Sequence, residues 1–221
     1  MENKKISLTA KISISAIAVV SFANFFNLSL VKDIGFAGIS ILIGVISFFV
    51  VKTIEKQPFE GSGFNIRAIP KNLRSIKNCF WLITPIIWGV ITLPIIIKFF
   101  PDAVAYDKWR AAPYITYDNT LMTVFMLFIL ALGEEIGMRA FLQNHLCRIM
   151  PVTSAIIITS VLFTAGHYAA GDITLVSMNL VSVFVLSVLY GMVFHKTKNA
   201  WISAFAHFLS NSFVLIIYGV I

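Results

Sequence analysis

The apolar run LMTVFMLFILALGEEIGMRAFLQNHLCRIM (residues 121–150) carries three charged residues in its middle: Glu134, Glu135 and Arg139. Glu135 and Arg139 are four residues apart with the acid first, which is the favourable order for an ion pair on one helical face. Glu134 is turned by about 100° from Glu135 on a helix, so it points elsewhere and has no partner nearby in the sequence. We therefore predict a structural ion pair between Glu135 and Arg139, and a Glu134 that is available for chemistry.

Two further apolar runs carry histidines. One ends near His167, with Phe163 one turn earlier, and the other places a polar stripe at i, i+4, i+7 and i+8: Ser203, His207, Ser210 and Asn211. A single histidine in such a run is more often a hydrogen-bond partner between helices than a catalyst, and a polar stripe is also typical of helix packing. Taken as a set with Glu134, these residues favour one shared site.

The residue types in this set suit hydrolysis of an amide. Glu134 would act as a general base, and together with His167 it would hold and deprotonate a water molecule. His207 and Asn211, which are hydrogen-bond donors one turn apart, would stabilise the oxyanion that forms on the substrate carbonyl. This scheme needs no cofactor. The alternative is a zinc site formed by Glu134, His167 and His207, although the sequence has no HExxH helix that would arrange the ligands.

The elements that would position these residues follow from the length of the apolar runs, since a bilayer core needs about 20 mostly apolar residues per helix. Seven runs satisfy this rule, at residues 12–31, 34–51, 79–97, 120–146, 152–168, 173–194 and 200–221. Pro85 and Pro94 lie inside the third run, where we expect a kinked helix rather than a break. Residues 98–119 are expected to form a polar, aromatic-rich loop. For the first run, the alternative is a cleaved signal peptide.

The composition supports a membrane protein. Of the 221 residues, 58% are hydrophobic and 12% are charged, and the mean hydropathy is +0.89, whereas soluble domains are about 25% charged. We predict an all-α, polytopic membrane bundle of about seven helices in a single domain (1–221), made of N-terminal helices with a basic loop (1–118) and a catalytic core (119–215). The net charge of +7 is spread over short loops, which favours contact with a lipid bilayer and excludes a nucleic-acid-binding stripe.

The distribution of Lys and Arg predicts the orientation of the helices. With the N-terminus inside, twelve basic residues fall in the inner loops and four in the outer loops, and only Arg139 lies within a span. This bias predicts a multi-pass protein of the plasma membrane with a cytoplasmic N-terminus.

Three motifs in these runs resemble those of the CPBP family, which comprises CAAX proteases and bacteriocin-processing enzymes and is also called the Abi family. Residues 134–139, EEIGMR, resemble its EExxxR motif, residues 163–167, FTAGH, resemble FxxxH, and residues 207–211, HFLSN, resemble HxxxN. The resemblance covers about residues 119–215. Met138 and Ala140 depart from the family pattern, which commonly has an aromatic residue before the Arg and Gly after it.

The resemblance implies an intramembrane endopeptidase, with either a glutamic or a metal-dependent mechanism. Carried over by motif, Glu134 and His167 activate water, His207 and Asn211 form the oxyanion hole, and Glu135 with Arg139 supports the architecture. The implied partner is a membrane-associated substrate, either a prenylated protein or a peptide precursor. Two other interpretations are a non-catalytic immunity or regulatory protein, and a small transporter with a proton relay through Glu134 and the histidines.

Overall fold

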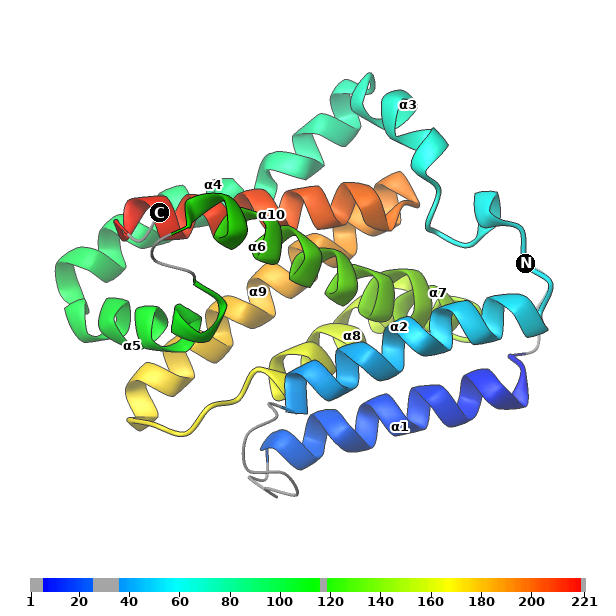
Figure 1. Ribbon diagram of the computed structural model, residues 1–221, viewed down its shortest axis with the longest axis horizontal. Coiled ribbons are helices and arrows are strands. Elements are labelled where there is room, and N and C mark those ends of the chain that lie inside the picture. The colour runs from blue at the N-terminus through cyan, green and yellow to red at the C-terminus, as the bar shows by residue number, and fades with distance from the viewer. Residues whose placement is uncertain (1–5, 26–35, 116–118, 220–221) are drawn as a thin grey trace.

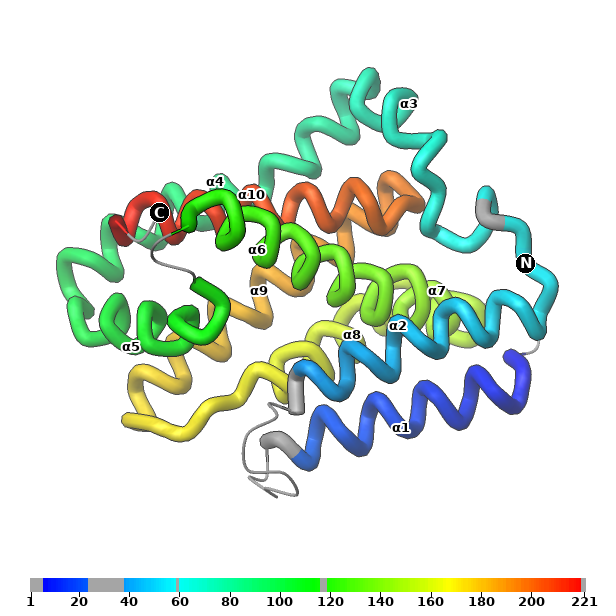
Figure 2. Tube along the Cα trace, viewed as in Figure 1, coloured from blue at the N-terminus to red at the C-terminus, as the bar shows by residue number. Residues whose placement is uncertain are grey.

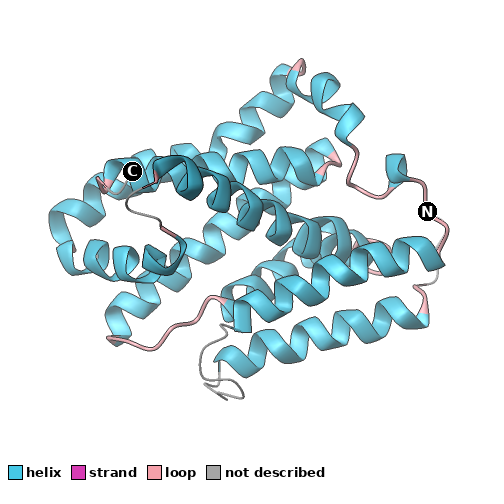
Figure 3. Cartoon of the chain, viewed as in Figure 1, coloured by secondary structure: helices cyan, strands magenta, loops and turns pink. Residues whose placement is uncertain are grey.

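The protein is a bundle of helices in a computed structural model that describes residues 6–25, 36–115 and 119–219. No strand occurs within these ranges (Figure 3), so the all-α prediction is confirmed. The long apolar helices are α1 (Leu8–Phe25), α2 (Phe36–Ile54), α4 (Ile76–Phe99), α6 (Thr120–Glu135), α8 (Val152–Gly166), α9 (Ile173–Thr197) and α10 (Ala200–Ile217).

These helices correspond to the seven predicted runs. Among the described residues, four segments are long and apolar enough to cross a membrane, at Ile76–Phe99, Thr120–Leu146, Ile173–Thr197 and Ala200–Ile217, and α1, α2 and α8 contain shorter apolar segments. Pro85 and Pro94 lie within a continuous α4, as expected. Lys4, Lys5 and Lys32, which were counted for the orientation, lie outside the described residues, as do residues 26–31, 34–35 and 220–221 of the predicted runs.

The path of the chain through the bundle is visible in Figures 1 and 2. Helix α1 packs against α2 and α8, α6 packs against α10, and α9 contacts α4, α8 and α10. The helices that carry the three motifs are thus connected: α6 contacts α10 directly, and α8 and α10 both contact α9.

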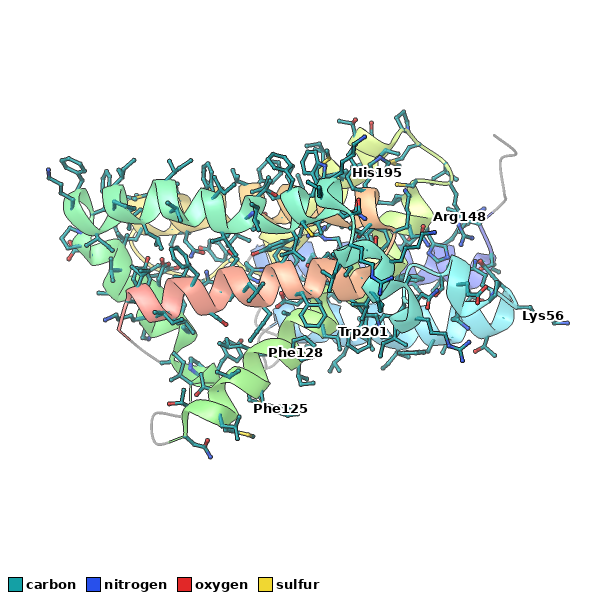
Figure 4. All side chains as sticks on the ribbon, turned by 90° about the horizontal axis from the view of Figure 1, so that it is seen from above. Lys56, Phe125, Phe128, Arg148, His195 and Trp201 are labelled. Carbon is teal, nitrogen blue, oxygen red and sulfur yellow. The ribbon has the colours of Figure 1, made fainter. Side chains whose placement is uncertain are left out.

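The long helices run alternately between two ends of the molecule (Figure 1). At one end, the loops after α2, α7 (Asn144–Leu146) and α9 meet: the Ala200 backbone N–H donates to the Gly63 carbonyl over 2.7 Å, and Asn199 Nδ2 donates to the Asn65 carbonyl over 2.8 Å. Lys56, Arg148 and His195 gather at this basic end (Figure 4). Which side of the membrane it faces stays a prediction.

The outward faces of the helices are apolar and the interior is partly polar. Among the most exposed large side chains are Ile76 (87%), Leu121 (79%) and Ile173 (76%). Glu135 and Arg139, in contrast, are completely buried. A soluble protein would not expose this much apolar surface, whereas lipid-facing helices with polar interiors are expected in a bilayer.

The structure corrects the prediction of a loop at residues 98–119. The segment Pro101–Ala111 forms a helix, α5, which joins α4 to α6 at the end opposite the basic loops (Figure 1). Pro101 lies in its first turn, Asp102 follows it, and Lys108 and Arg110 lie in its last turn, which is the arrangement that stabilises a short helix. The basic loop likewise contains short helical turns at Phe59–Gly61, Ile66–Ala68 and Ile69–Leu73 (α3).

The helix that carries the EExxxR motif is also not regular throughout. After α6 ends at Glu135, residues Ile136–Gln143 form a π-helical segment, η4, before the chain continues as α7. Helix α2 packs directly against η4: a Cβ atom on Gly44 would lie 2.7 Å from the Cα of Gly137. Glycine is therefore required at this crossing, because any side chain would push the two backbones apart. Short π-helical segments are frequent at functional sites.

A polar cluster at the basic end connects the residue that follows α2 to α7 and the segment after it. Arg148 Nη1 lies 2.9 Å from Glu55 Oε2, and His145 Nε2 lies 3.8 Å from Glu55 Oε1. Burial by itself would raise the pKa of Glu55, but the hydrogen bonds and charge of Arg148, together with a hydrogen bond from Ser7, outweigh it and hold this pKa below its usual value.

This cluster predicts a pH-dependent contribution to stability. Because the folded-state pKa of Glu55 is lowered, its contribution is present above the unfolded-state pKa, which is about 4.3, and is lost as the pH falls through the folded-state value. We expect Glu55→Gln to lower the free energy of unfolding by about 1–3 kcal/mol at pH 7. Thermal unfolding of both proteins in detergent should show this gap closing toward pH 3, and a constant gap would contradict the assignment.

Candidate active site

All four residues predicted to be catalytic line one cavity. Its volume is about 980 Å³, and residues of α2, α4, α5, α6, α8, α9 and α10 surround it. Glu134, His167, His207 and Asn211 are all among the lining residues. The remaining wall is largely apolar, although serine, tyrosine and charged side chains also contribute to it.

The imidazole of His207 lies between two carboxylates. Its Nδ1 is 3.2 Å from Glu135 Oε1, and its Nε2 is 3.5 Å from Glu134 Oε2. As expected, Glu134 has no partner nearby in the sequence, but its carboxylate and that of Glu135 both reach the same histidine on α10. Two side chains separated by about 100° on one helix can contact opposite edges of a ring that packs between them.

Arg139 neutralises Glu135 in the interior. Its Nε lies 3.3 Å from Glu135 Oε2, its Nη2 donates to Ser187 Oγ over 2.9 Å, and its guanidinium carbon is 5.6 Å from the centre of the Phe163 ring. The ion pair expected from the four-residue spacing is thus present. Since Glu135 is held by Arg139 on one oxygen and by His207 on the other, it fixes the orientation of the imidazole.

His167 ends α8 at the cavity wall. Its Nδ1 lies 2.8 Å from the carbonyl oxygen of Phe163, which can only accept a hydrogen bond, so this nitrogen carries the proton and Nε2 is an acceptor. The Phe163 ring lies between the two histidines, with its centre 4.2 Å from that of His167 and 6.2 Å from that of His207. Within the described part of the chain, Glu134 pairs with His207 and shows no hydrogen bond to His167.

Asn211 lies one helical turn after His207 on α10. It is half-buried and lines the cavity. Both residues therefore belong to the same wall, where the polar stripe of α10 meets the cavity.

The arrangement does not form a three-ligand metal site. Across the described ranges, no group of three or more His, Cys, Asp or Glu side chains is placed to hold a metal ion. Nδ1 of His167 is bonded to Phe163, and both nitrogens of His207 face carboxylates. Among the described residues, the alternative zinc set of Glu134, His167 and His207 is thus not assembled, and dependence on a metal stays a prediction.

Tyr190 of α9 was not identified from the sequence. Its ring stacks on that of His207 with 4.3 Å between the centres and 18° between the planes, and it is almost completely buried. A tyrosine within an apolar run has no spacing signal that would reveal this contact, because the partner is on another helix.

The stack predicts a positioning role for Tyr190. An aromatic contact of this kind contributes about 0.5–1.5 kcal/mol. If this amount is added to the activation free energy, Tyr190→Ala should lower kcat by about threefold to tenfold, with KM little changed. Tyr190→Phe keeps the ring and should retain the wild-type kcat. An equal effect of both substitutions on the cleavage rate would assign the role to the hydroxyl group instead.

The fold and the site together define a helical membrane protein with a buried Glu–His–Arg centre. Residues 116–213 match the family model described as Rce1-like, type II CAAX prenyl endopeptidase. The matched segment includes all three motifs, so the resemblance to the CPBP family is confirmed, and the second half of the chain has the sequence pattern of CAAX-type membrane proteases. No curated protein and no solved structure gives a significant match to the chain.

Proposed function

We propose that this protein is an intramembrane endopeptidase that uses water to hydrolyse a peptide bond of a membrane-associated substrate, either a prenylated protein or a peptide precursor. The observation that carries the proposal is the pairing of Glu134 with His207 in the cavity, 3.5 Å apart. The family match over residues 116–213 supports the same class of reaction.

The contacts of His207 determine where a proton resides. Glu135 is paired with Arg139 and is therefore an acceptor for the Nδ1–H of His207. Nε2 then faces Glu134 across 3.5 Å, and the position of one proton shared between these two groups decides whether both are charged or both are neutral. With this proton on Nε2, Glu134 is an anionic base and His207 is a cationic donor.

This state is suited to attack by water. Glu134 and the acceptor Nε2 of His167 orient a water molecule, and Glu134 takes its proton while the water oxygen bonds to the substrate carbonyl carbon. The carbonyl electron pair moves to oxygen, where His207 Nε2–H and the Asn211 side-chain amide stabilise the negative charge. The C–N bond then breaks, and Glu134 returns its proton to the leaving amine.

The test is cleavage by the purified protein in liposomes. A library of lipid-anchored peptides should yield defined products by mass spectrometry. We expect Glu134→Gln and His167→Ala to lower the rate by at least about 100-fold, whereas Glu60→Gln, a matched change at an exposed site, should have no effect. Unchanged cleavage by either site variant would refute the mechanism. A complete lack of wild-type cleavage would favour the immunity or transport interpretations.

A further inference from the structure

The segment that joins α2 to α4 carries a cluster of positive charge that the active site does not use. Four basic residues recur in it at intervals of three or four: Arg67, Lys71, Arg74 and Lys77. The sequence has no Asp or Glu between Glu60 and Asp102 that could neutralise them locally. The cluster leads directly into Ile76–Phe99, which is long and apolar enough to cross a membrane. Its charges therefore lie where a spanning helix leaves the bilayer.

These four side chains are exposed, and none of them takes part in an ion pair within the described part of the chain. A fifth cation lies beside them: Lys196, near the end of α9, is exposed and has its Nζ 5.6 Å from the centre of the Trp81 ring. Trp81 follows Lys77 by four residues on α4, so both cations are on the same side of that helix. Together the five side chains form what we call the basic patch: Arg67, Lys71, Arg74, Lys77 and Lys196.

Large apolar side chains alternate with these cations and are also exposed. Ile66, Leu73 and Ile76 are 61%, 46% and 87% exposed, and α3 lies at the outer edge of the bundle (Figure 1). An exposed segment that mixes apolar and basic side chains beside a spanning helix is typical of the membrane interface. There, the apolar side chains enter the acyl boundary while the cations contact phosphate groups.

Hydrogen bonds hold the segment in place before any ligand binds. Asn78 Nδ2 on α4 donates to Asn72 Oδ1 on α3 over 2.8 Å, and Asn72 Nδ2 donates to the Ala68 carbonyl over 3.0 Å. Asn199 Nδ2 at the start of α10 donates to the Asn65 carbonyl over 2.8 Å. The cations are thus attached to a fixed turn, so binding orders little more than their side chains.

We infer that the basic patch is a binding site for anionic phospholipids of the bilayer. A Lys or Arg close to a negative membrane surface contributes about fivefold to the affinity, and Ile66 and Leu73 add contacts with acyl chains that a soluble anion would not provide. The site is separate from the cavity that contains Glu134, and the inference does not depend on peptide cleavage.

Bound lipid should also stabilise the fold, because the patch is fastened to the first turn of α10. The Ala200 backbone N–H donates to the Gly63 carbonyl over 2.7 Å, and the Phe64 ring stacks on that of Trp201 with 5.0 Å between the centres. Lipid that bridges α3, α4 and the end of α9 opposes their separation from α10. A ligand that binds only the folded state raises its stability.

The first test measures lipid preference in phosphatidylcholine vesicles that contain phosphatidylglycerol. Bromine atoms on the acyl chains of either lipid quench tryptophan fluorescence, so brominated phosphatidylglycerol and brominated phosphatidylcholine can be compared at Trp81. The wild-type protein should prefer phosphatidylglycerol at low salt, and high salt should weaken the preference because exposed charges are screened. Lys71→Gln/Arg74→Gln should lower the preference by about 10-fold to 25-fold. An unchanged preference in this variant would overturn the inference.

A matched variant separates a site from general attraction to a basic protein. Lys98→Gln/Lys108→Gln removes the same charge from exposed positions at the other end of the molecule, and it should keep the wild-type preference. Equal losses in the two double variants would show that no localised site exists. Trp81→Phe should abolish the additional quenching by phosphatidylglycerol, and quenching that persists would place the lipid elsewhere and contradict the inference.

The second test measures thermal unfolding in neutral detergent. Added phosphatidylglycerol should raise the unfolding temperature by about 2–4 °C, phosphatidylcholine should not, and Lys71→Gln/Arg74→Gln should lose the rise. Inorganic phosphate at the same ionic strength as a chloride control should reproduce none of it. A rise with phosphatidylcholine or with inorganic phosphate equal to that with phosphatidylglycerol would refute an anionic-phospholipid site. Both tests are read without substrate, so their outcome is independent of the proposed endopeptidase activity.

Discussion

Replacing His207 with alanine is expected to lower peptide cleavage by at least about 1,000-fold, because this residue contributes to two parts of the reaction. Its Nε2 faces Glu134 at 3.5 Å and its Nδ1 faces Glu135 at 3.2 Å. Without the imidazole, the oxyanion loses a donor and Glu134 loses the group with which it shares a proton. The two carboxylates would also face each other without the ring between them.

The measurement is the initial rate of release of the C-terminal fragment in liposomes. His195→Ala is a matched control, since it makes the same change on α9 at the basic end of the molecule (Figure 4), and it should retain the wild-type rate. His207→Gln keeps one hydrogen-bond donor and should lie between wild type and alanine. A His207→Ala protein that folds normally and cleaves within threefold of the wild-type rate would remove His207 from the mechanism.

Much of the fold could be predicted because a bilayer imposes one length on every spanning helix. The predicted run 173–194 became Ile173–Thr197, and 152–168 became Val152–Gly166. Helix α5 was missed because it is short and mixed in composition, so neither length nor apolar periodicity distinguishes it from a loop. The π-helical segment Ile136–Gln143 has no sequence signature at all, since it reflects how η4 packs against α2.

The site was predictable to the extent that its contacts are local. The i,i+4 rule predicted the ion pair between Glu135 and Arg139, and the motifs predicted which residues line the cavity. Which of the two histidines pairs with Glu134 could not be predicted, because the pairing depends on the relative rotation of α6, α8 and α10. Arg110 falls within the predicted loop at residues 98–119, and its place in the cavity follows only from the helix α5 that the structure shows there.

Arg139 is expected to have the largest effect on stability. Its side chain is completely buried and holds the charge of Glu135, which is also completely buried. Removing one member of a buried pair leaves an uncompensated charge, which typically costs about 3–5 kcal/mol. We therefore expect Arg139→Met to lower the free energy of unfolding in detergent by about 3–5 kcal/mol. This figure includes the loss of the hydrogen bond from Arg139 to Ser187.

The companion substitution separates the charge from the packing. In Glu135→Gln/Arg139→Met, no charge is left unpaired, so the double variant should be more stable than Arg139→Met alone by at least about 1 kcal/mol. Arg74→Met is the control, because this arginine is exposed and its loss should change stability by less than about 0.5 kcal/mol. Chemical unfolding followed by circular dichroism provides the comparison. A double variant no more stable than Arg139→Met would show that Arg139 stabilises the bundle through packing against Phe163 and Ser187 rather than through the charge of Glu135.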